Sequence, residues 1–241
     1  MPSSRPEPPP ATGHPGHPAH GASGPEAPGD VFADPMYAET ADIVTFNDVT
    51  DPDLWVRPTG NPAPIEIVDH DPAWADHFSE AAHRIRRALS PIGTFGGLEH
   101  VGSTSVPGLR AKPIIDMALV VTDPRDEAGY VPVLNSIGFG LTVREPAWYE
   151  HRMLKRLDPD PGQLDCHLHV FGPRCAEVAR MRLFRDHLRR HGDDRERYQA
   201  VKSAAAAQSN ALGETGMDYN ARKQAVVREI YRRIFEAEGW E

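Results

Sequence analysis

The stretch HVGSTSVPGLRAKPIIDMALVV, residues 100–121, decides the fold. Its second half, Pro113 to Val121, is a nearly continuous apolar run that contains one charged residue, Asp116. Such a run is typical of a central strand that is buried on both faces. The first half is a Gly/Ser/Thr/Pro segment, residues 102–108, that predicts a tight turn beside that strand. A carboxylate on a buried strand next to such a turn predicts a functional corner.

The residue types at this corner suit a phosphorylated ligand. The turn offers the backbone amides and hydroxyls of Gly102, Ser103, Thr104 and Ser105, and such a nest accepts phosphate oxygens without a lysine. Asp116 could hold a divalent cation that bridges the same phosphates. We therefore expect a site for a nucleotide or another small phosphorylated ligand. The alternative is a structural turn beside an internally bonded aspartate.

Two other phosphate and hydrolase motifs do not fit. Residues 97–104, GLEHVGST, have the glycine spacing of a Walker A loop, but Ser103 stands where the lysine is needed to reach the terminal phosphates. The turn also lacks the G-x-S-x-G elbow that exposes a nucleophilic serine. We expect neither a P-loop nor a serine hydrolase.

The pattern around the corner predicts an α+β domain with a mixed sheet, flanking helices and a C-terminal helical layer. Proline and glycine separate the segments. The expected strands are residues 65–68, 98–101, 113–121, 139–143, 153–157 and 165–171, and the expected helices are residues 73–90, 125–137, 178–188, 198–212 and 219–237.

The strand DCHLHVF, residues 165–171, alternates at a period of two. Asp165, His167 and His169 therefore share one face, and apolar residues occupy the other. Together with Asp116 these side chains could bind one cation, and the histidines would favour zinc or manganese over magnesium. The alternative is that both histidines hydrogen-bond within a polar cleft.

Several basic residues could neutralise an anionic ligand, with lysine acting as a point charge and arginine as a bidentate clamp. These candidates are Lys112, Arg152, Lys202, Arg222 and Lys223. Lys112 is placed best, because it lies between the turn and Asp116. His100 precedes the turn and is a candidate catalytic acid or base, with a structural cap as its alternative role.

Residues 100–116 closely resemble the signature of the GrpB (UPF0157) family, which has a nucleotidyltransferase-like fold. Residues 66–74, 150–152, 166–170 and 184–189 are also similar to segments of that family, as are the Tyr/Lys pairs Tyr198 with Lys202 and Tyr219 with Lys223. The resemblance covers residues 64–238 and implies a nucleotidyltransferase-like mixed sheet for that domain.

One departure bears on catalysis. Active nucleotidyltransferases hold two metals with an Asp-x-Asp pair, and here the second position is Ala118. Two hypotheses follow: a metal-dependent nucleotidyltransferase with Asp116 as the catalytic carboxylate, or a non-catalytic ligand-binding or interaction module that retains the frame. A third hypothesis is that the N-terminal extension mediates interactions and the domain is structural. The long acidic, proline-rich extension is the feature that supports it.

Composition separates that extension from the domain. Residues 1–64 hold 14 of the 24 prolines, and residues 1–60 carry a net charge of −7 out of −9, which leaves −2 for the remainder. Such a segment buries too little apolar surface to offset the entropy of ordering it. We expect residues 1–60 to be a disordered acidic extension, although the apolar residues of 43–55 would allow docking onto the domain.

The near-neutral domain lacks the broad basic field of a duplex-DNA binder, so no duplex nucleic acid is expected as a partner. The sequence shows no signal peptide and no run of about eighteen apolar residues. Its two cysteines, Cys166 and Cys175, suit reduced thiols. We expect a cytoplasmic protein without a membrane partner.

Overall fold

The structure is a computed structural model that describes residues 37–49, 53–57, 64–157 and 159–240, all of which belong to one compact unit. The helices are α1 (Thr40–Val44), α2 (Trp74–Leu89), α3 (Glu127–Asn135), α4 (Ala176–Arg190), α5 (Gly192–Leu212) and α6 (Gly216–Glu238), and the strands are β1 (Phe95–Val101), β2 (Ile114–Val121), β3 (Phe139–Glu145), β4 (His151–Arg156) and β5 (Asp165–Phe171).

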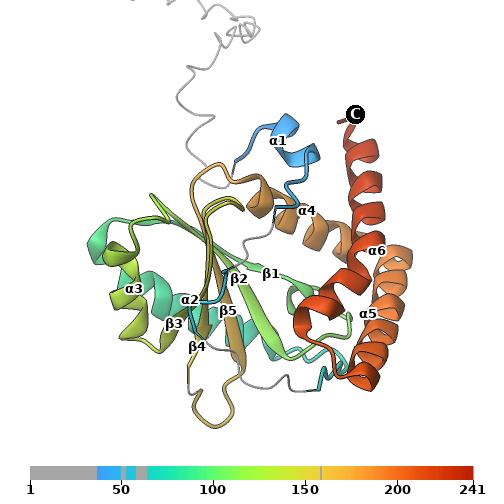
Figure 1. Cartoon of the computed structure of the whole chain (residues 1–241), viewed down its shortest axis with the longest axis horizontal. Helices are drawn as coiled ribbons and strands as arrows, with labels where there is room; N and C mark the ends of the chain where they lie inside the picture. The colour runs from blue at the N-terminus through green and yellow to red at the C-terminus, as the bar shows by residue number, and fades with distance from the viewer. Residues whose placement is uncertain (1–36, 50–52, 58–63, 158, 241) are drawn as a thin grey trace, which may run out of the picture. The chain divides into compact units, whose positions relative to one another are not determined.

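The five strands form one mixed sheet in the order β1-β2-β5-β4-β3 (Figure 1). β2 pairs in parallel with β5, and the other three pairs are antiparallel. The apolar run after Pro113 therefore lies in the interior of the sheet, where its residues are covered on both faces. The predicted mixed sheet with flanking helices and a C-terminal helical layer is confirmed.

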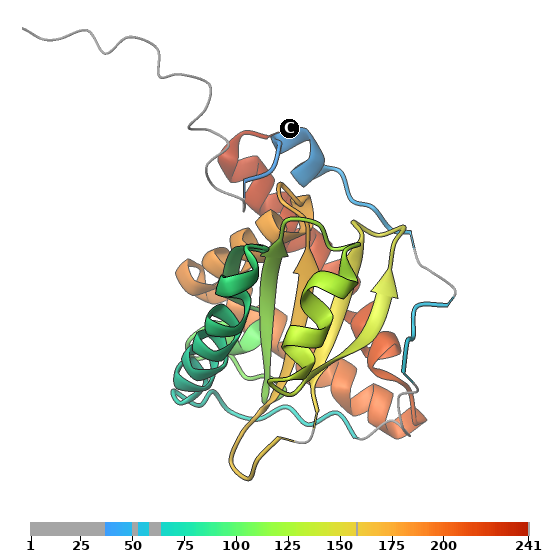
Figure 2. The same ribbon diagram turned by 90° about the vertical axis from the view of Figure 1, so that its left-hand side faces the viewer.

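Alternation along β2 divides the core into two layers. Ile115, Met117 and Leu119 join the cluster that α2 and α3 cover, whereas Ala118 and Val120 pack on the opposite face with residues of α4. Figure 2 shows α3 in front of the sheet and the C-terminal helices behind it. Asp116 shares the second face, because it alternates with the first set. The strand that builds the core thus directs its one charge toward α4, α5 and α6.

Local differences from the predicted elements have identifiable causes. Residues 65–68 do not form a strand, since only Val68 makes an isolated bridge to Ala111. The side chain of Asn210 in α5 instead bonds both the amide and the carbonyl of Ile65, at 2.7 and 2.9 Å. α5 begins at residue 192 rather than 198, and its first turn is acidic, which favours the positive end of the helix dipole.

The segment 37–49 packs on the domain through Arg180 of α4, which is 1% exposed. Its guanidinium donates to the carbonyls of Asp42, Ile43 and Thr45 at 2.9–3.2 Å and to the Tyr149 hydroxyl at 2.7 Å. These residues fall within the extension predicted over 1–60. Its described part is therefore ordered, because one buried arginine satisfies several backbone carbonyls at once.

A second piece of the extension covers an edge of the sheet. The amide of Val56 donates to the Thr142 carbonyl at 2.9 Å, and the amide of Arg144 donates to the Leu54 carbonyl at 2.8 Å. Both bonds involve β3, the outermost strand, so residues 54–56 satisfy part of its free backbone. No helix among the described residues is long and apolar enough to cross a bilayer.

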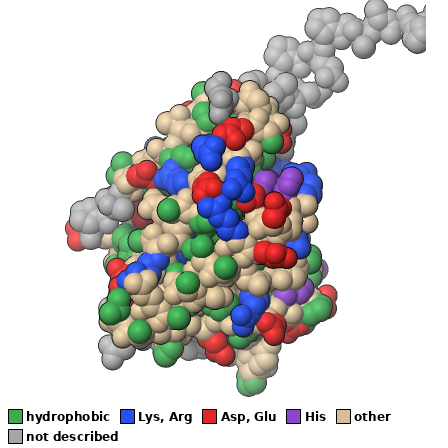
Figure 3. All heavy atoms as spheres, turned by 90° about the vertical axis from the view of Figure 1, so that its right-hand side faces the viewer, with side chains coloured by type: hydrophobic (Ala, Val, Ile, Leu, Met, Phe, Trp, Pro, Cys, Tyr) green, Lys and Arg blue, Asp and Glu red, His purple; other side chains and the backbone are tan. Residues whose placement is uncertain are grey.

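The outer surface of the C-terminal helices carries both signs of charge (Figure 3). Glu229 of α6 pairs with Arg197 of α5 and with Arg233, and Arg233 also pairs with Asp194. Because each of these arginines is paired with an acidic residue, this group of side chains forms no broad patch of a single charge.

Replacing Arg180 with alanine is expected to lower the free energy of unfolding by roughly 3 kcal/mol, because three carbonyls and the Glu177 carboxylate lose a buried partner. Denaturant unfolding measures the change, and limited proteolysis should show new cleavage within residues 37–49. Arg232→Ala is the control, since that arginine makes one exposed ion pair to Glu236 and should cost less than about 1 kcal/mol. Equal losses of unfolding free energy in Arg180→Ala and Arg232→Ala would contradict the role of Arg180 in holding residues 37–49 on the domain.

Candidate functional site

A cavity of about 860 Å³ lies between the sheet and the C-terminal helices. The strands supply Asp116, His167 and His169, and the turn after β1 supplies Ser103. α5 and α6 close the opposite wall with two tyrosines and two lysines, which are Tyr198, Lys202, Tyr219 and Lys223. Its volume falls within the range of small-molecule sites. The corner predicted from residues 100–121 is therefore one wall of a larger pocket.

The turn approaches the strand so closely that only glycine fits at position 102. A Cβ on Gly102 would lie 2.4 Å from Asp116 Oδ2, and the backbone there has φ 68° and ψ −171°. That region is essentially restricted to glycine. Because Gly102 has no side chain, the turn can lie directly beside the Asp116 carboxylate.

Asp116 meets the two histidines of β5 through the strand register. β2 and β5 pair in parallel with Asp116 beside His167 and Ala118 beside His169. Asp116 Oδ1 lies 3.4 Å from His167 Nδ1 and 3.9 Å from His169 Nε2. One ligand atom from each residue lies within 4.8 Å of the other two, a spacing that suits a shared cation.

The electrostatics of this cluster favour an ionised carboxylate. Burial disfavours the charged form of Asp116, but the neighbouring imidazoles, His167 before His169, outweigh it and hold the pKa of the carboxyl well below its usual range. Burial lowers the pKa of His167, against the opposing influence of Asp116. An anionic oxygen and a neutral imidazole are the forms that bind a dication.

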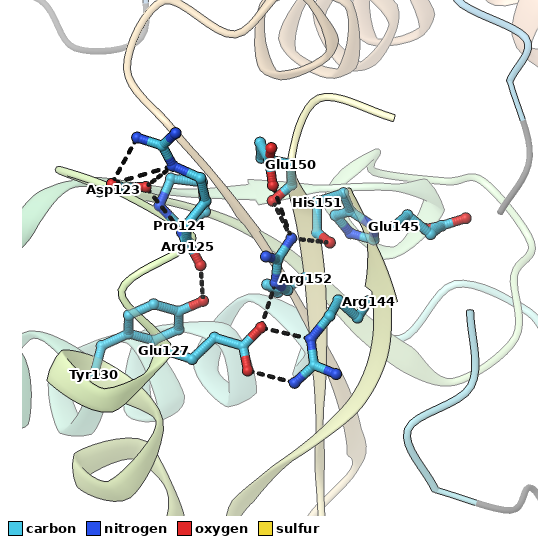
Figure 4. A network of polar contacts seen from close by, with 10 residues as sticks. All are labelled: Asp123, Pro124, Arg125, Glu127, Tyr130, Arg144, Glu145, Glu150, His151 and Arg152. Carbon is cyan, nitrogen blue, oxygen red and sulfur yellow. Dashed lines mark hydrogen bonds and ion pairs between the residues drawn. The ribbon is translucent and has the colours of Figure 1, made fainter. Parts of the chain in front are cut away.

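His169 continues into a chain of buried hydrogen bonds. Its Nδ1 lies 3.1 Å from Nε2 of His151, and Nδ1 of His151 lies 2.7 Å from the Glu145 carboxylate. Figure 4 shows His151 and Glu145 side by side. His151 is 3% exposed, and burial lowers its pKa to about 4, so the imidazole is neutral.

The lysines make the cavity electropositive. Burial, followed by the charge of a neighbouring lysine, lowers the pKa of Lys202 to about 7 and that of Lys223 to about 8. Burial also lowers the pKa of Lys112, against the opposing influence of Asp116. An anion placed among these side chains would favour their protonated forms.

Tyr219 stands between two of these lysines. The ammonium of Lys223 lies 4.2 Å from its ring centroid and that of Lys112 lies 5.1 Å away. Tyr219 is 1% exposed, and its buried hydroxyl has no hydrogen-bond partner among the described residues. Burial raises its pKa, so the hydroxyl keeps its proton as a donor.

Other hydroxyls of the predicted turn are already used within the protein. Thr104 Oγ1 donates to the Ile114 carbonyl at 3.0 Å, and Ser105 Oγ donates to the Gly102 carbonyl at 2.6 Å. Both residues are buried and do not line the cavity, whereas Ser103 does. A short 3₁₀ turn over residues 103–105 rotates successive side chains to different sides. Of the three hydroxyls expected to contact phosphate, the structure places one at the pocket.

Two predicted site residues lie away from the cavity. His100 stacks on Phe78 of α2 with ring centroids 4.5 Å apart, and it approaches the Thr104 hydroxyl at 3.2 Å. Burial lowers its pKa to about 4. His100 therefore lies beneath α2 and does not line the cavity, because its side chain alternates with that of Val101, which does.

Arg152 points toward α3, on the face opposite the cavity. Its guanidinium bonds the Glu127 carboxylate at 2.6 Å and the Glu150 carbonyl at 2.9 Å (Figure 4). Glu127 also binds Arg144 from the neighbouring strand. This arginine therefore ties β4 to α3 rather than binding a ligand in the cavity.

Asp165 lines the rim of the cavity but is exposed and does not join the cluster of Asp116 with the two histidines. The sequence alone did not identify His151, Lys155 or Tyr219 as site residues, although His151 and Tyr219 are among the positions that resemble the family. Lys155 pairs in register with His167, and this register brings it to the cavity face. Alternation of side chains along β4 could have identified His151 and Lys155, but only once the pairing of β4 with β5 was known.

Position 118, where an Asp-x-Asp pair would place its second carboxylate, is occupied by Ala118. It is fully buried and packs with Phe171 and with Val178 of α4. An aspartate there would be enclosed between the sheet and a helix, beside His169. The site can therefore offer one carboxylate and two imidazoles from the strands.

A mixed sheet with a carboxylate beside a Gly/Ser turn is consistent with the nucleotidyltransferase-like superfamily. The chain belongs to the GrpB family, whose model, described as GrpB protein, matches residues 64–233. A UPF0157 protein of Halalkalibacterium halodurans is 44% identical over 171 residues, covering 71% of this chain and 83% of that protein. A UPF0157 protein of Streptomyces coelicolor is 41% identical over 177 residues, covering 72% of this chain and 87% of that protein.

A solved structure supports the same assignment. The crystal structure of the conserved protein GrpB from Enterococcus faecalis superposes with a TM-score of 0.57 at 25% sequence identity, covering 73% of this chain and all of that one. The family name specifies no reaction, so the functional argument depends on the cavity itself.

Replacing Gly102 with alanine is expected to destabilise the protein by at least about 3 kcal/mol, because the new Cβ meets Asp116 in a backbone region that alanine avoids. Gly108→Ala is the matched control: its φ is also positive, at 77°, but nothing lies within 4 Å of its added Cβ. That variant should lose only about 1 kcal/mol. Denaturant unfolding compares them, and similar losses would show that the contact with Asp116 is unimportant.

Proposed function

We propose that the protein binds a nucleotide or a related phosphorylated ligand in this cavity, together with a divalent cation. One observation carries the proposal: the cluster of Asp116, His167 and His169 faces a wall of lysines across the same pocket. A cation bound to the cluster and the lysines opposite it would contact one ligand from two sides. Polyphosphates are recognised in this way, by metal and ammonium together.

The charge balance of the cavity supports an anionic ligand. Its lining includes two carboxylates, Asp116 and Asp165, against five cationic side chains, which are Lys112, Lys155, Arg156, Lys202 and Lys223. Lys202 is committed to the Arg110 carbonyl at 2.7 Å, so it positions the wall more than it contacts a ligand. Arg156 likewise donates to the Leu164 carbonyl at 3.0 Å, which leaves Lys112, Lys155 and Lys223 as the ligand-facing charges.

Aromatic and polar groups add selectivity. Tyr198 and Tyr219 line the wall opposite the sheet, and Ser103 lies at the turn. The Ser103 hydroxyl and the unpartnered Tyr219 hydroxyl could donate to ligand oxygens. When bound, the cation would withdraw charge from a phosphoryl oxygen and so make the phosphorus atom more electrophilic.

The buried Ala118 favours a second candidate function. With one carboxylate on β2, the chain cannot hold two metals through an Asp-x-Asp pair, so a non-catalytic module that binds the same ligand fits the geometry as well. Both candidates share the cation and the phosphorylated ligand. They differ in whether a nucleotidyl group is transferred.

Calorimetric titration of each common nucleoside triphosphate, with magnesium, manganese or zinc present, tests the shared claim. Asp116→Ala is expected to weaken metal-dependent binding at least about 10-fold, because the carboxylate is the only anionic member of the cluster. Asp165→Ala is the matched control, which removes an equal charge at the rim and should retain binding. Unfolding curves establish that both variants fold.

Turnover separates the two functions. Transfer of a labelled nucleotidyl group to acceptors in a mixed pool, abolished in Asp116→Ala, would support the enzyme. Binding without any transfer would support the non-catalytic module. Absence of binding to every triphosphate with every metal would refute the proposal.

The Tyr219 hydroxyl offers a test that separates ligand binding from stability. Tyr219→Phe keeps the ring under Lys223 and removes an unpaired buried donor, so stability should stay unchanged or rise by about 1 kcal/mol while nucleotide affinity falls several-fold. Thermal melting and calorimetry measure the two effects. Tyr130→Phe is the reverse control: that hydroxyl donates to the Pro124 carbonyl at 2.8 Å, so its loss should cost about 1 kcal/mol and leave affinity unchanged. Unchanged affinity in Tyr219→Phe would remove this hydroxyl from the site.

A further inference from the structure

Two residues outside the cluster determine which nitrogen of His169 is available to a metal. The hydrogen-bond chain runs from Glu145 on β3 through His151 on β4 to His169 on β5, with lengths of 2.7 and 3.1 Å. It therefore crosses three adjacent strands and ends at the side chain that faces Asp116.

The positions of the protons follow from the chemistry of the partners. A carboxylate only accepts, so the His151 Nδ1 atom that faces Glu145 carries the proton. Neutral His151 then has a lone pair on Nε2 and accepts from His169 Nδ1. The tautomer of His169 that donates from Nδ1 has its lone pair on Nε2.

That Nε2 atom faces Asp116 Oδ1 at 3.9 Å, which is too long for a hydrogen bond. In this tautomer the facing atoms of His169 and Asp116 both carry lone pairs. A cation between them would satisfy both. The Nδ1 atom of His167 lies 3.4 Å from the same oxygen and is the third candidate ligand atom.

We infer that His151 and Glu145 are positioning residues, which hold His169 as a nitrogen ligand and so make the cluster a site for a zinc-type dication rather than for magnesium. Two imidazoles and one carboxylate form a ligand set that suits zinc or manganese, whereas magnesium prefers oxygen ligands in octahedral geometry. Three protein ligands leave a further coordination position for water or a phosphoryl oxygen.

Packing restricts the rotation of the relay imidazole. The His151 ring stacks on Phe171 at 4.8 Å between centroids and meets Trp148 edge to face at 5.1 Å. It also stacks against His169 itself at 5.2 Å. The orientation that accepts from His169 is thus maintained by aromatic contacts as well as by Glu145. A metal-ligating histidine whose second nitrogen bonds such a partner is the usual arrangement.

The test measures metal affinity directly and rests on the cation of the proposed function. Zinc is titrated into the full chain against a chromophoric chelator, and manganese and magnesium are titrated by calorimetry. His151→Phe keeps the ring packing but removes the acceptor, and zinc affinity is expected to fall about 10- to 100-fold. His151→Gln places an amide oxygen near the lost Nε2 and should restore most of the affinity.

A second position keeps the test decisive if His151→Phe does not fold. Glu145→Leu removes the acceptor of the His151 Nδ1 proton and should also weaken zinc binding. Glu150→Leu is the matched control, because Glu150 is a nearby carboxylate that contacts Arg152 and should leave zinc affinity unchanged. Melting of the metal-free variants establishes folding.

The outcomes distinguish this inference from the proposed function. Zinc binding that is equally tight in wild type, His151→Phe and Glu145→Leu would overturn the relay and leave the ligand site intact. Tighter binding of magnesium than of zinc by the wild type would overturn the metal class. Absence of any dication binding, with nucleotide binding preserved, would overturn both the relay and the cation.

Discussion

The parallel pairing of β2 with β5 is the constraint on which the site depends. It joins the two-stranded antiparallel part of the sheet, β1 and β2, to the three-stranded part, β5, β4 and β3. Its register places Asp116 beside His167, and strand alternation then brings His169 to the same face. A shift of one residue would direct both histidines into the apolar layer under α2 and α3, where their desolvation would have no compensation.

This pairing also explains how a site can exist in the middle of a core. The residues of β2 on either side of Asp116 are buried, and the carboxylate keeps access to solvent only through the cavity. Gly102 supplies the space beside it, and the histidines supply the electrostatic compensation that keeps the carboxyl ionised. The polar cluster is tolerated because its three side chains stay 20–30% exposed, and their remaining bonding capacity is directed toward the cavity.

The C-terminal helices convert this cluster into a pocket. α5 and α6 bring their tyrosines and lysines over the sheet, although α5 begins only after the last strand has ended at Phe171 and α6 follows α5. The pKa values of Lys202 and Lys223 fall because burial and the charge of a neighbouring lysine both disfavour the protonated forms. Such a wall is costly in a purely structural role, and this cost supports a ligand-binding one.

Local patterns were sufficient for most of the fold. The apolar run of β2, the period-two alternation of β5 and the helical spacing of α2 are properties of short segments, so the sequence determined these elements and the face on which each polar side chain lies. It also determined that Asp116, His167 and His169 would be available as ligands, since strand geometry sets the direction of each side chain. The strand expected at 65–68 failed because Asn210, a distant side chain, took its backbone bonds.

Only the tertiary structure decided which of these residues meet. His100 lies on a strand as predicted and Arg152 lies on β4, one residue before the expected strand 153–157, yet their side chains point to α2 and α3. The relay through His151 to Glu145 required the order β5-β4-β3. Strand order, register and helix docking arise from contacts between residues far apart in the chain, and no short pattern encodes them. The sequence thus determined the ligand atoms on each element, whereas the long-range packing decided that a carboxylate, two imidazoles and a wall of lysines enclose one cavity.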